Sequence, residues 1–284
     1  MRWPPFQHIF FDCDSTLTTV EGIDVLAATA NKQWRVEVLT NAAMNGQLDL
    51  ADVYGKRLQA IHPTRKHIQA IRQVYKRNIV PDAAELIACL QYLGHNVYII
   101  SGGLAEPVTE FGIFLGVAKE QIRAVDVDYN ELSTGWWESN KTDDLNARYM
   151  AYHEGALTVS NGKAKIVKEL LGDQKGKALL IGDGSSDLLA GHAVDLFVGF
   201  GGVVARPRVQ EESPVFLESA SLAPLLALAA GPEGLRRVEN TKFAALSNTA
   251  KQLIEQGAFS FKNERLNQKF QQAYQAIYPR TNGS

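Results

Sequence analysis

The sequence predicts an α/β protein with a Rossmann-like parallel sheet at its core. Short apolar runs recur along the chain, and most are preceded by a segment in which apolar residues have helical spacing. Strands that alternate with helices in this way form βαβ units, in which neighbouring strands are parallel. Each run ends in polar residues or glycines, and ligands bind beyond the carboxyl ends of such strands. The runs are His8–Asp12, Asn96–Ile100, Ala178–Ile181 and Asp195–Val198.

The first run is short and almost entirely apolar, as expected of a strand that is buried on both faces. After it, residues 21–75 have a helical pattern throughout, interrupted by Pro63 and followed by Pro81. A helical stretch inserted after the first strand predicts a small cap over the edge of the sheet. The predicted boundaries are residues 1–20 and 80–231 for the core, 21–79 for the helical cap and 232–284 for a C-terminal extension.

The later elements continue the alternation of helices and strands. Helical patterns over Ala83–Leu93 and Lys163–Leu171 precede the second and third predicted strands. Between them, Ile122–Trp137 alternates in polarity and contains Ser-Thr-Gly, which predicts a β-hairpin near the site. Residues from 232 onward are polar and mostly helical in pattern, so we expect a separate helical tail.

The composition is that of an ordinary globular protein. Of the 284 residues, 45% are apolar and 21% are charged, and the net charge of −2 provides no general attraction to nucleic acid or lipid. No secretory pattern or bilayer-spanning stretch is present in the sequence. Cys13 and Cys89 lack metal or redox spacing; a disulfide between them is conceivable, but two reduced thiols are favoured. We expect a cytoplasmic protein without nucleic-acid or membrane partners, for which a homo-oligomer is possible.

Four motifs carry the candidate chemistry. Taken alone, each has an ordinary explanation: an incomplete calcium loop, a turn, a lysine on a helix face and a tight loop. The first lacks the glycine of an EF-hand, because Leu17 stands in its place. Their order and their shared position after strands point to one site. The motifs are Asp12-Cys-Asp-Ser-Thr-Leu-Thr18, Ser101-Gly-Gly103, Asn161-Gly-Lys163 and Gly182-Asp-Gly-Ser-Ser-Asp187.

This combination resembles the haloacid-dehalogenase-like phosphatases, and within them the phosphoserine phosphatase branch. The resemblance covers about residues 8–230 and includes Glu21-Gly-Ile-Asp24, Met44, and Arg57 followed by Pro63. It implies a Mg²⁺-dependent phosphomonoester hydrolase that acts through a covalent aspartyl-phosphate. It also implies a small phosphorylated metabolite as substrate, with L-phosphoserine favoured and hence a place in serine biosynthesis.

The residue types suit that chemistry. Asp12 would be the nucleophile, and Mg²⁺ would offset its repulsion from the phosphate. Asp14 would protonate the leaving alkoxide and then deprotonate the water that hydrolyses the acyl-phosphate. By the resemblance, the metal ligands are Asp12, the main-chain carbonyl of Asp14, and Asp183. Asp187 would lie behind them and orient Lys163 or a metal-bound water.

The phosphoryl group would be held by the second and third motifs. Ser101 would donate its hydroxyl, and Gly102 and Gly103 would allow backbone N–H groups to approach closely. Lys163 would neutralise the transferring group. Lys165 is the alternative for this role, which the spacing of the family disfavours.

Substrate selection is expected in the cap. The resemblance places Glu21 opposite a substrate ammonium and Arg57 opposite a carboxylate, the two groups that phosphoserine carries. Alternatively, these two residues are surface charges or pair with each other. Met44 would be a residue of the cap core that also touches substrate.

Several features depart from the pattern of the branch. Ser186 stands where many members have asparagine, although its hydroxyl can still hydrogen-bond to substrate. Asn45 stands where glycine is usual, which would alter how the cap closes. Residues 136–153 form a longer stretch than expected, and its Trp136-Trp137 pair would reshape the pocket. The tail after residue 232 has no counterpart in the branch.

Two other functions stay open. One is the same chemistry on another small phosphorylated metabolite, including phosphotransfer to an acceptor. The other is a catalytically weak regulatory or scaffolding protein whose tail binds a partner. The presence of both Asp12 and Asp14 argues against the latter, since a protein without catalysis has no need for both carboxylates.

Overall fold

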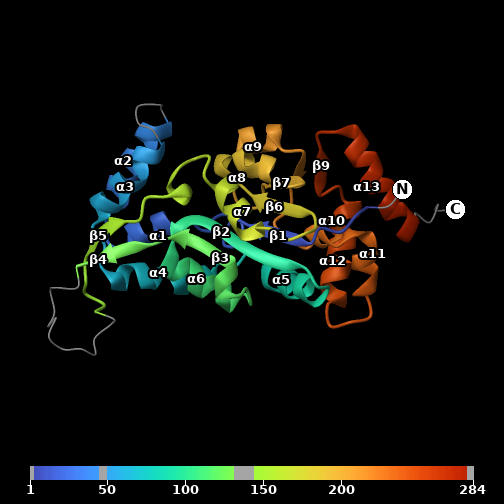
Figure 1. Ribbon diagram of the computed structural model, residues 1–284, viewed down its shortest axis with the longest axis horizontal. Coiled ribbons are helices and arrows are strands. Elements are labelled where there is room, and N and C mark those ends of the chain that lie inside the picture. Colours follow the sequence, from blue (N-terminus) through green and yellow to red (C-terminus); the bar gives the residue numbers. More distant parts are fainter. Residues whose placement is uncertain (1–2, 45–49, 131–143, 280–284) are drawn as a thin grey trace.

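The computed structural model describes residues 3–44, 50–130 and 144–279. Its centre is a seven-stranded sheet in the order β3-β2-β1-β6-β7-β8-β9 (Figure 1). All neighbouring strands are parallel except β9, which runs antiparallel to β8. The strands are β1 (His8–Phe11), β2 (Asn96–Leu104), β3 (Ile122–Val125), β6 (Ala178–Gly182), β7 (Leu196–Phe200), β8 (Val215–Leu217) and β9 (Phe259–Phe261).

The central strands are the apolar runs that the sequence predicts. Every residue of β1 and of β6 is buried, as expected for strands covered on both faces. The chain adds β2 and β3 on one side of β1, and then places β6 on its other side. The strand order therefore reverses between β1 and β6, and such a reversal opens a crevice at the carboxyl ends of the strands.

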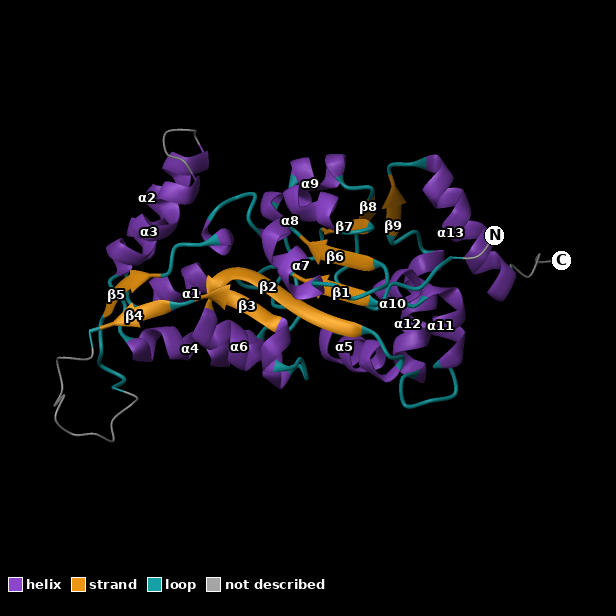
Figure 2. Cartoon of the chain, viewed as in Figure 1, coloured by secondary structure: helices purple, strands orange, loops and turns teal. Residues whose placement is uncertain are grey.

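Helices cover both faces of the sheet (Figure 2). Because side chains alternate along a strand, Ile9 and Phe11 join one apolar cluster and Phe10 joins the other. The cluster around Phe10 includes residues of α7, α8 and α9, while α5, α6 and α10 contribute to the opposite one. The predicted Rossmann-like architecture is thus confirmed. These helices are α5 (Ala83–Tyr92), α6 (Ala105–Phe114), α7 (Lys163–Leu171), α8 (Ser185–Ala190), α9 (Pro207–Glu212) and α10 (Leu225–Ala229).

The segment inserted after β1 is helical in its described part. It lies at one end of the molecule, together with a small antiparallel sheet of β4 (Val127–Tyr129) and β5 (Tyr149–Tyr152) (Figure 1). Thr64 caps α4 by accepting a hydrogen bond from the backbone N–H of His67 at 3.3 Å, which explains why a new helix starts after Pro63. The inserted helices are α1 (Gly22–Thr29), α2 (Gln33–Met44), α3 (Leu50–Ile61) and α4 (Arg65–Arg77).

The hairpin predicted over residues 122–137 is wrong in its pairing. Residues 122–125 form β3, which lies parallel to β2 at the edge of the main sheet. The next strand, β4, pairs with β5 and not with β3. Short alternating segments do not reveal their partner, because the same pattern suits an edge strand and a hairpin arm. Residues 131–143 lie outside the described part of the chain.

The C-terminal segment is mostly helical, as expected, but it is not separate from the core. Its strand β9 pairs with β8 and completes the sheet. On α13, Phe270 packs edge-on against Trp3 with ring centroids 5.2 Å apart. Three residues of strand are too few to recognise from sequence. The helices of this segment are α11 (Gly231–Arg237), α12 (Ala244–Glu255) and α13 (Glu264–Ile277), and one-turn 3₁₀ helices elsewhere span Lys119–Gln121, Ala156–Thr158 and Gly191–Ala193.

Among the helices of the described ranges, none combines the length and the apolar character that crossing a bilayer requires.

Candidate active site

The predicted catalytic residues lie at the carboxyl ends of the central strands. Asp12 directly follows β1, Ser101 lies in the second half of β2, and Asp183 directly follows β6. Since β1 lies between β2 and β6, the three positions are neighbours in space. This is the crevice at which the strand order reverses, where the sequence analysis expected the site.

Three buried carboxylates converge in this crevice. Oxygen atoms of Asp12, Asp183 and Asp187 all lie within 4.8 Å of one another. Burial, together with the nearby charge of Asp12, raises the pKa of both Asp183 and Asp187. A bound cation would relieve this repulsion, and carboxylate oxygens are the donors that Mg²⁺ prefers. The donor set therefore fits the predicted magnesium ion.

Lys163 supplies a positive charge from within the protein. Its side chain is buried, and Nζ lies 2.8 Å from Asp12 Oδ1 and 2.6 Å from Asp187 Oδ1. Burial alone would lower the pKa of Lys163, but the two carboxylates raise it above its usual value, so the amine stays charged. Lys165 is exposed on the same helix. Of the two lysines that the sequence left open, Lys163 is the one that contacts Asp12.

The glycine before Lys163 has a steric reason. A Cβ atom at Gly162 would lie 1.6 Å from the carbonyl oxygen of Ala156, so only glycine fits where the chain enters α7.

Asp187 has a second contact besides Lys163, because its Oδ2 accepts a hydrogen bond from the backbone N–H of Gly184 at 3.1 Å. The Asp187 carboxylate therefore both caps α8 and holds Lys163.

Asp14 lies in a different environment from Asp12. Its Oδ1 accepts a hydrogen bond from the Tyr75 hydroxyl at 2.5 Å, and its Oδ2 accepts one from the backbone N–H of Gly22 at 3.1 Å. Burial and the charge of Glu21 raise the pKa of Asp14 to about 8, although the two donors oppose this. A carboxyl group with a pKa near neutrality can both give and take a proton.

The Ser-Gly-Gly segment adjoins Asp14. Ser101 is buried, and its Oγ accepts a hydrogen bond from the backbone N–H of Gly103 at 2.9 Å. A Cβ atom at Gly103 would lie 3.1 Å from Ser101 Oγ and 3.5 Å from Asp14 Oδ2. At Gly102, a Cβ atom would lie 3.4 Å from the carbonyl oxygen of Leu157. The segment thus presents a hydroxyl and unhindered backbone beside the carboxyl group of Asp14.

Glu21 and Arg57 do not pair with each other in the described structure. Glu21 Oε1 accepts hydrogen bonds from Ser15 Oγ at 2.8 Å and from Arg206 Nη2 at 3.1 Å. The Nε atom of Arg57 is buried and has no hydrogen-bond partner among the described residues. Burial lowers the pKa of Arg57, and the charge of Glu21 acts in the opposite direction. Arg57 therefore has an unused donor near Glu21.

Other predicted residues are placed only in part. Ser186 is half-buried in the first turn of α8. Met44 ends α2, but its side chain lies outside the described part of the structure, as does Asn45. The Trp136-Trp137 pair also falls outside it, whereas the end of that long stretch forms β5.

Three residues that touch the site were not predicted as site residues from the sequence, although Thr16 lies within the first motif. Arg206 donates from Nε to Asp183 Oδ2 at 2.9 Å, and so links that carboxylate to Glu21. Thr16 donates to Asp183 Oδ1 at 3.3 Å, and Tyr75 donates to Asp14. Arg206 follows β7, so its position after a strand was an available signal. Tyr75 lies within a helical pattern, which contains no such signal.

The two cysteines are free and buried. Cys13 lies between Asp12 and Asp14 in sequence, and its backbone N–H donates to Asp12 Oδ1 at 2.8 Å. Burial, reinforced by Asp14 and Asp12, raises the pKa of the Cys13 thiol well above its usual range. A thiol with a raised pKa stays protonated and is a poor nucleophile.

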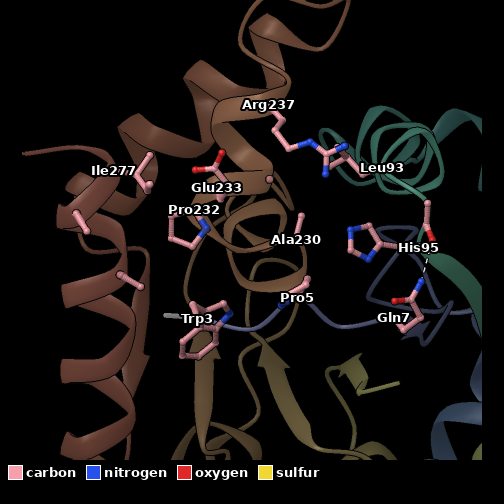
Figure 3. A pocket seen from close by; sticks show the side chains of 14 residues that line it. Trp3, Pro5, Gln7, Leu93, His95, Ala230, Pro232, Glu233, Arg237 and Ile277 are labelled. Carbon is pink, nitrogen blue, oxygen red and sulfur yellow. Dashed lines mark hydrogen bonds between the residues drawn. The ribbon is translucent and has the colours of Figure 1, made fainter. Parts of the chain in front are cut away.

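A hollow of about 690 Å³ lies elsewhere, where the N-terminal segment, the turn before β2, α11 and α13 meet. Trp3 and Pro232 flank it on one side and His95 and Gln7 on the other (Figure 3). Because β2 begins at Asn96, this hollow is at the amino ends of the strands. None of the candidate residues described above lines it; they gather in the crevice at the carboxyl ends.

Comparison with known proteins identifies the family of this chain. The model of the haloacid dehalogenase-like hydrolases matches residues 6–195. Phosphoserine phosphatase from Mus musculus is 32% identical over 213 residues, which cover 74% of this chain and 88% of the mouse protein. The Homo sapiens phosphoserine phosphatase is 31% identical over 212 residues, with coverage of 74% and 88%.

Solved structures agree in fold. A substrate-bound phosphoserine phosphatase complex superposes with a TM-score of 0.64 at 22% identity, covering 78% of this chain and 98% of that chain. A phospho-aspartyl intermediate analogue of phosphoserine phosphatase gives a TM-score of 0.63 with the same identity and coverage. The chain therefore belongs to the haloacid dehalogenase-like hydrolases, and within them to the phosphatases that resemble phosphoserine phosphatase.

Proposed function

We propose that this phosphatase hydrolyses L-phosphoserine through a covalent aspartyl-phosphate on Asp12, with Mg²⁺ as its cofactor. The observation that carries the proposal is the buried cluster of Asp12, Asp183 and Asp187 with Lys163 beside it. A nucleophilic carboxylate can approach a phosphate dianion only where positive charge offsets their repulsion. The cluster combines such a carboxylate with one fixed cation and with oxygen donors for a second.

The first half of the reaction transfers the phosphoryl group to the protein. The Asp12 carboxylate oxygen attacks phosphorus as the bond to the alkoxide breaks, and Asp14 gives its proton to the leaving oxygen. Ser101 and the backbone N–H groups of the Ser-Gly-Gly segment hold the phosphoryl oxygens, and Lys163 offsets their charge. The proposed Mg²⁺ ligands are Asp12, Asp183 and the main-chain carbonyl of Asp14, and the ion would neutralise further charge on the transferring group.

The second half returns the protein to its starting state. Asp14, now ionised, takes a proton from a water molecule whose oxygen attacks phosphorus. The bond from phosphorus to Asp12 breaks, inorganic phosphate leaves, and Asp14 is protonated again. The environments of the two carboxylates suit these roles. Asp12 contacts a buried lysine, whereas Asp14 is half-buried beside neutral donors.

The choice of phosphoserine rests on Glu21 and Arg57 and on the names of the relatives. We propose that residues 21–79 form a cap over the crevice, because Glu21 and Tyr75 already reach its groups. An unpaired buried donor costs free energy, so the Nε atom of Arg57 favours an incoming acceptor such as a carboxylate. Glu21 would bind the ammonium group. A reducing compartment such as the cytoplasm suits the free thiols.

The test is phosphate release from a panel of phosphorylated metabolites, with and without Mg²⁺. We expect phosphoserine to have the highest kcat/KM, and a chelator to abolish turnover until Mg²⁺ is restored. Turnover by a folded Asp12→Asn protein would refute the covalent mechanism. A different preferred metabolite would refute the substrate assignment alone.

A further inference from the structure

The carboxyl group of Asp14 is held on both of its oxygens by the inserted helices. Tyr75, near the end of α4, donates its hydroxyl to Oδ1 at 2.5 Å. Gly22, the first residue of α1, donates its backbone N–H to Oδ2 at 3.1 Å. Tyr75 is completely buried, and its ring packs edge-on against Phe111 with centroids 5.4 Å apart. The orientation of Asp14 is therefore set by the cap segment, although Asp14 itself belongs to the loop after β1.

The close approach of Tyr75 depends on the absence of a side chain at Gly22. A Cβ atom at that position would lie 2.2 Å from the Tyr75 hydroxyl oxygen and 3.4 Å from Asp14 Oδ2. Contacts below 3.0 Å force a neighbour to move, so alanine at residue 22 would push the hydroxyl away from the carboxyl group. The backbone conformation at Gly22 is not left-handed, so alanine itself is compatible with the start of α1.

The two oxygens of Asp14 have different surroundings. Oδ2 is the one near the Ser-Gly-Gly segment, since a Cβ atom at Gly103 would lie 3.5 Å from it and 3.1 Å from Ser101 Oγ. Oδ1 is anchored by Tyr75. A carboxylate oxygen has two lone pairs, so Oδ2 keeps one after accepting from Gly22. That position can carry the proton that goes to the leaving oxygen.

We propose that Tyr75 is a positioning residue for this phosphatase: its hydroxyl anchors Asp14 Oδ1 and so directs Oδ2 toward the leaving group. The inference rests on the proposed role of Asp14 as acid and base. Tyr75 keeps its own proton throughout. In the first step the proton on Asp14 goes to the alkoxide oxygen as its bond to phosphorus breaks. In the second step Asp14 recovers a proton from water.

If Asp14 is misdirected, substrates with different leaving groups are affected unequally. This difference distinguishes a positioning role of Tyr75 from a structural one. The alkoxide of serine is a poor leaving group and needs a proton as the bond breaks. The nitrophenolate ion of p-nitrophenyl phosphate is a stable anion that leaves without one. Loss of the Tyr75 hydroxyl should therefore slow phosphorylation of the protein by phosphoserine and spare phosphorylation by p-nitrophenyl phosphate. Damage to folding or cap closure would slow both.

The decisive variant is Tyr75→Phe, which removes one oxygen and keeps the ring. Rapid-quench and stopped-flow measurements would follow release of serine or nitrophenol in the first turnover. General acid–base catalysis contributes about 10²–10⁴-fold, so partial misdirection should slow the phosphoserine step roughly ten- to a hundredfold. The nitrophenol burst should change by less than about threefold, because its leaving group makes little use of the acid. The second step, which both substrates share, should slow equally for both.

Tyr274→Phe is the matched control, because the Tyr274 hydroxyl is buried on α13 and has no hydrogen-bond partner among the described residues. It should leave both bursts unchanged. Gly22→Ala is an independent second variant. If the Tm of Tyr75→Phe shows that this variant is unfolded, Gly22→Ala tests the positioning role in its place. We expect it to show the same substrate-selective loss. Equal slowing of both bursts in the folded variants, or no slowing, would overturn the inference.

Failure of the proposed function would have a different signature. In that case the wild-type protein would release no serine from phosphoserine, or folded Asp12→Asn would keep its turnover, and the role of Tyr75 would fall with it. With an active wild type and an inactive Asp12→Asn, the ratio of the two bursts tests Tyr75 alone.

Discussion

Replacing Arg57 with alanine should selectively impair turnover of phosphoserine. If the Arg57 guanidinium binds the substrate carboxylate, the substitution should not affect kcat/KM for a substrate that lacks a carboxylate. We expect kcat/KM for phosphoserine to fall about ten- to a hundredfold, and kcat/KM for p-nitrophenyl phosphate to stay within about twofold. The effect should appear mainly in KM, because the carboxylate contact is present in both the bound substrate and the transition state.

The magnitude follows from the surroundings of Arg57. A hydrogen bond to a charged group contributes about 1.5–3 kcal/mol, and about 1.4 kcal/mol corresponds to a tenfold change. Burial already lowers the pKa of Arg57 and its Nε atom lacks a partner, so part of the desolvation cost is borne before substrate arrives. The same lack of a partner means that Arg57→Ala breaks no hydrogen bond of Nε in the free protein. The loss of binding should therefore lie toward the upper part of the range.

The assay is steady-state phosphate release on the two substrates with three variants. Arg57→Lys should restore only part of the loss, because an ammonium group cannot reproduce the planar fork of a guanidinium. Lys56→Ala is the control, since Lys56 is exposed on the same helix. Equal losses on both substrates with Arg57→Ala would show that Arg57 supports cap folding or closure. Phosphoserine would then lose its main structural support, and the phosphatase assignment would stand.

Three further outcomes are expected. Asp12→Asn should remove several orders of magnitude of turnover without lowering Tm, because an amide is not a competent nucleophile and the substitution takes one charge out of a crowded cluster. Lys163→Met should destabilise the protein by about 3–5 kcal/mol in denaturant titrations, since it leaves buried carboxylates uncompensated, whereas Lys165→Met at an exposed position should not. Magnesium should raise Tm. Calorimetry should show a lower Kd for Mg²⁺ in Arg206→Gln than in the wild type, because the substitution removes a positive charge that contacts a carboxylate of the cluster. Unchanged Mg²⁺ affinity would show that this contact does not compete with the ion.

Much of the fold was predictable because it depends on consecutive residues. A strand covered on both faces must be apolar along its length, so β1, β2, β6 and β7 are visible as apolar runs. Helical periodicity similarly revealed the inserted segment. Parallel strands end at a common edge, so the placement of Asp12, Ser101 and Asp183 near one another also followed from the sequence.

Tertiary structure alone decided the partners of short strands and of side chains far apart in the chain. The alternating residues of β3 suit several pairings, and β9 has only three residues, so neither pairing was encoded locally. Tyr75 and Asp14 are 61 positions apart, and Arg206 and Glu21 are 185 apart. These contacts exist because the inserted helices lie against the crevice. The residues adjacent to a side chain in sequence carry no signal of such contacts, which arise only when α1 and α4 pack beside the loop after β1.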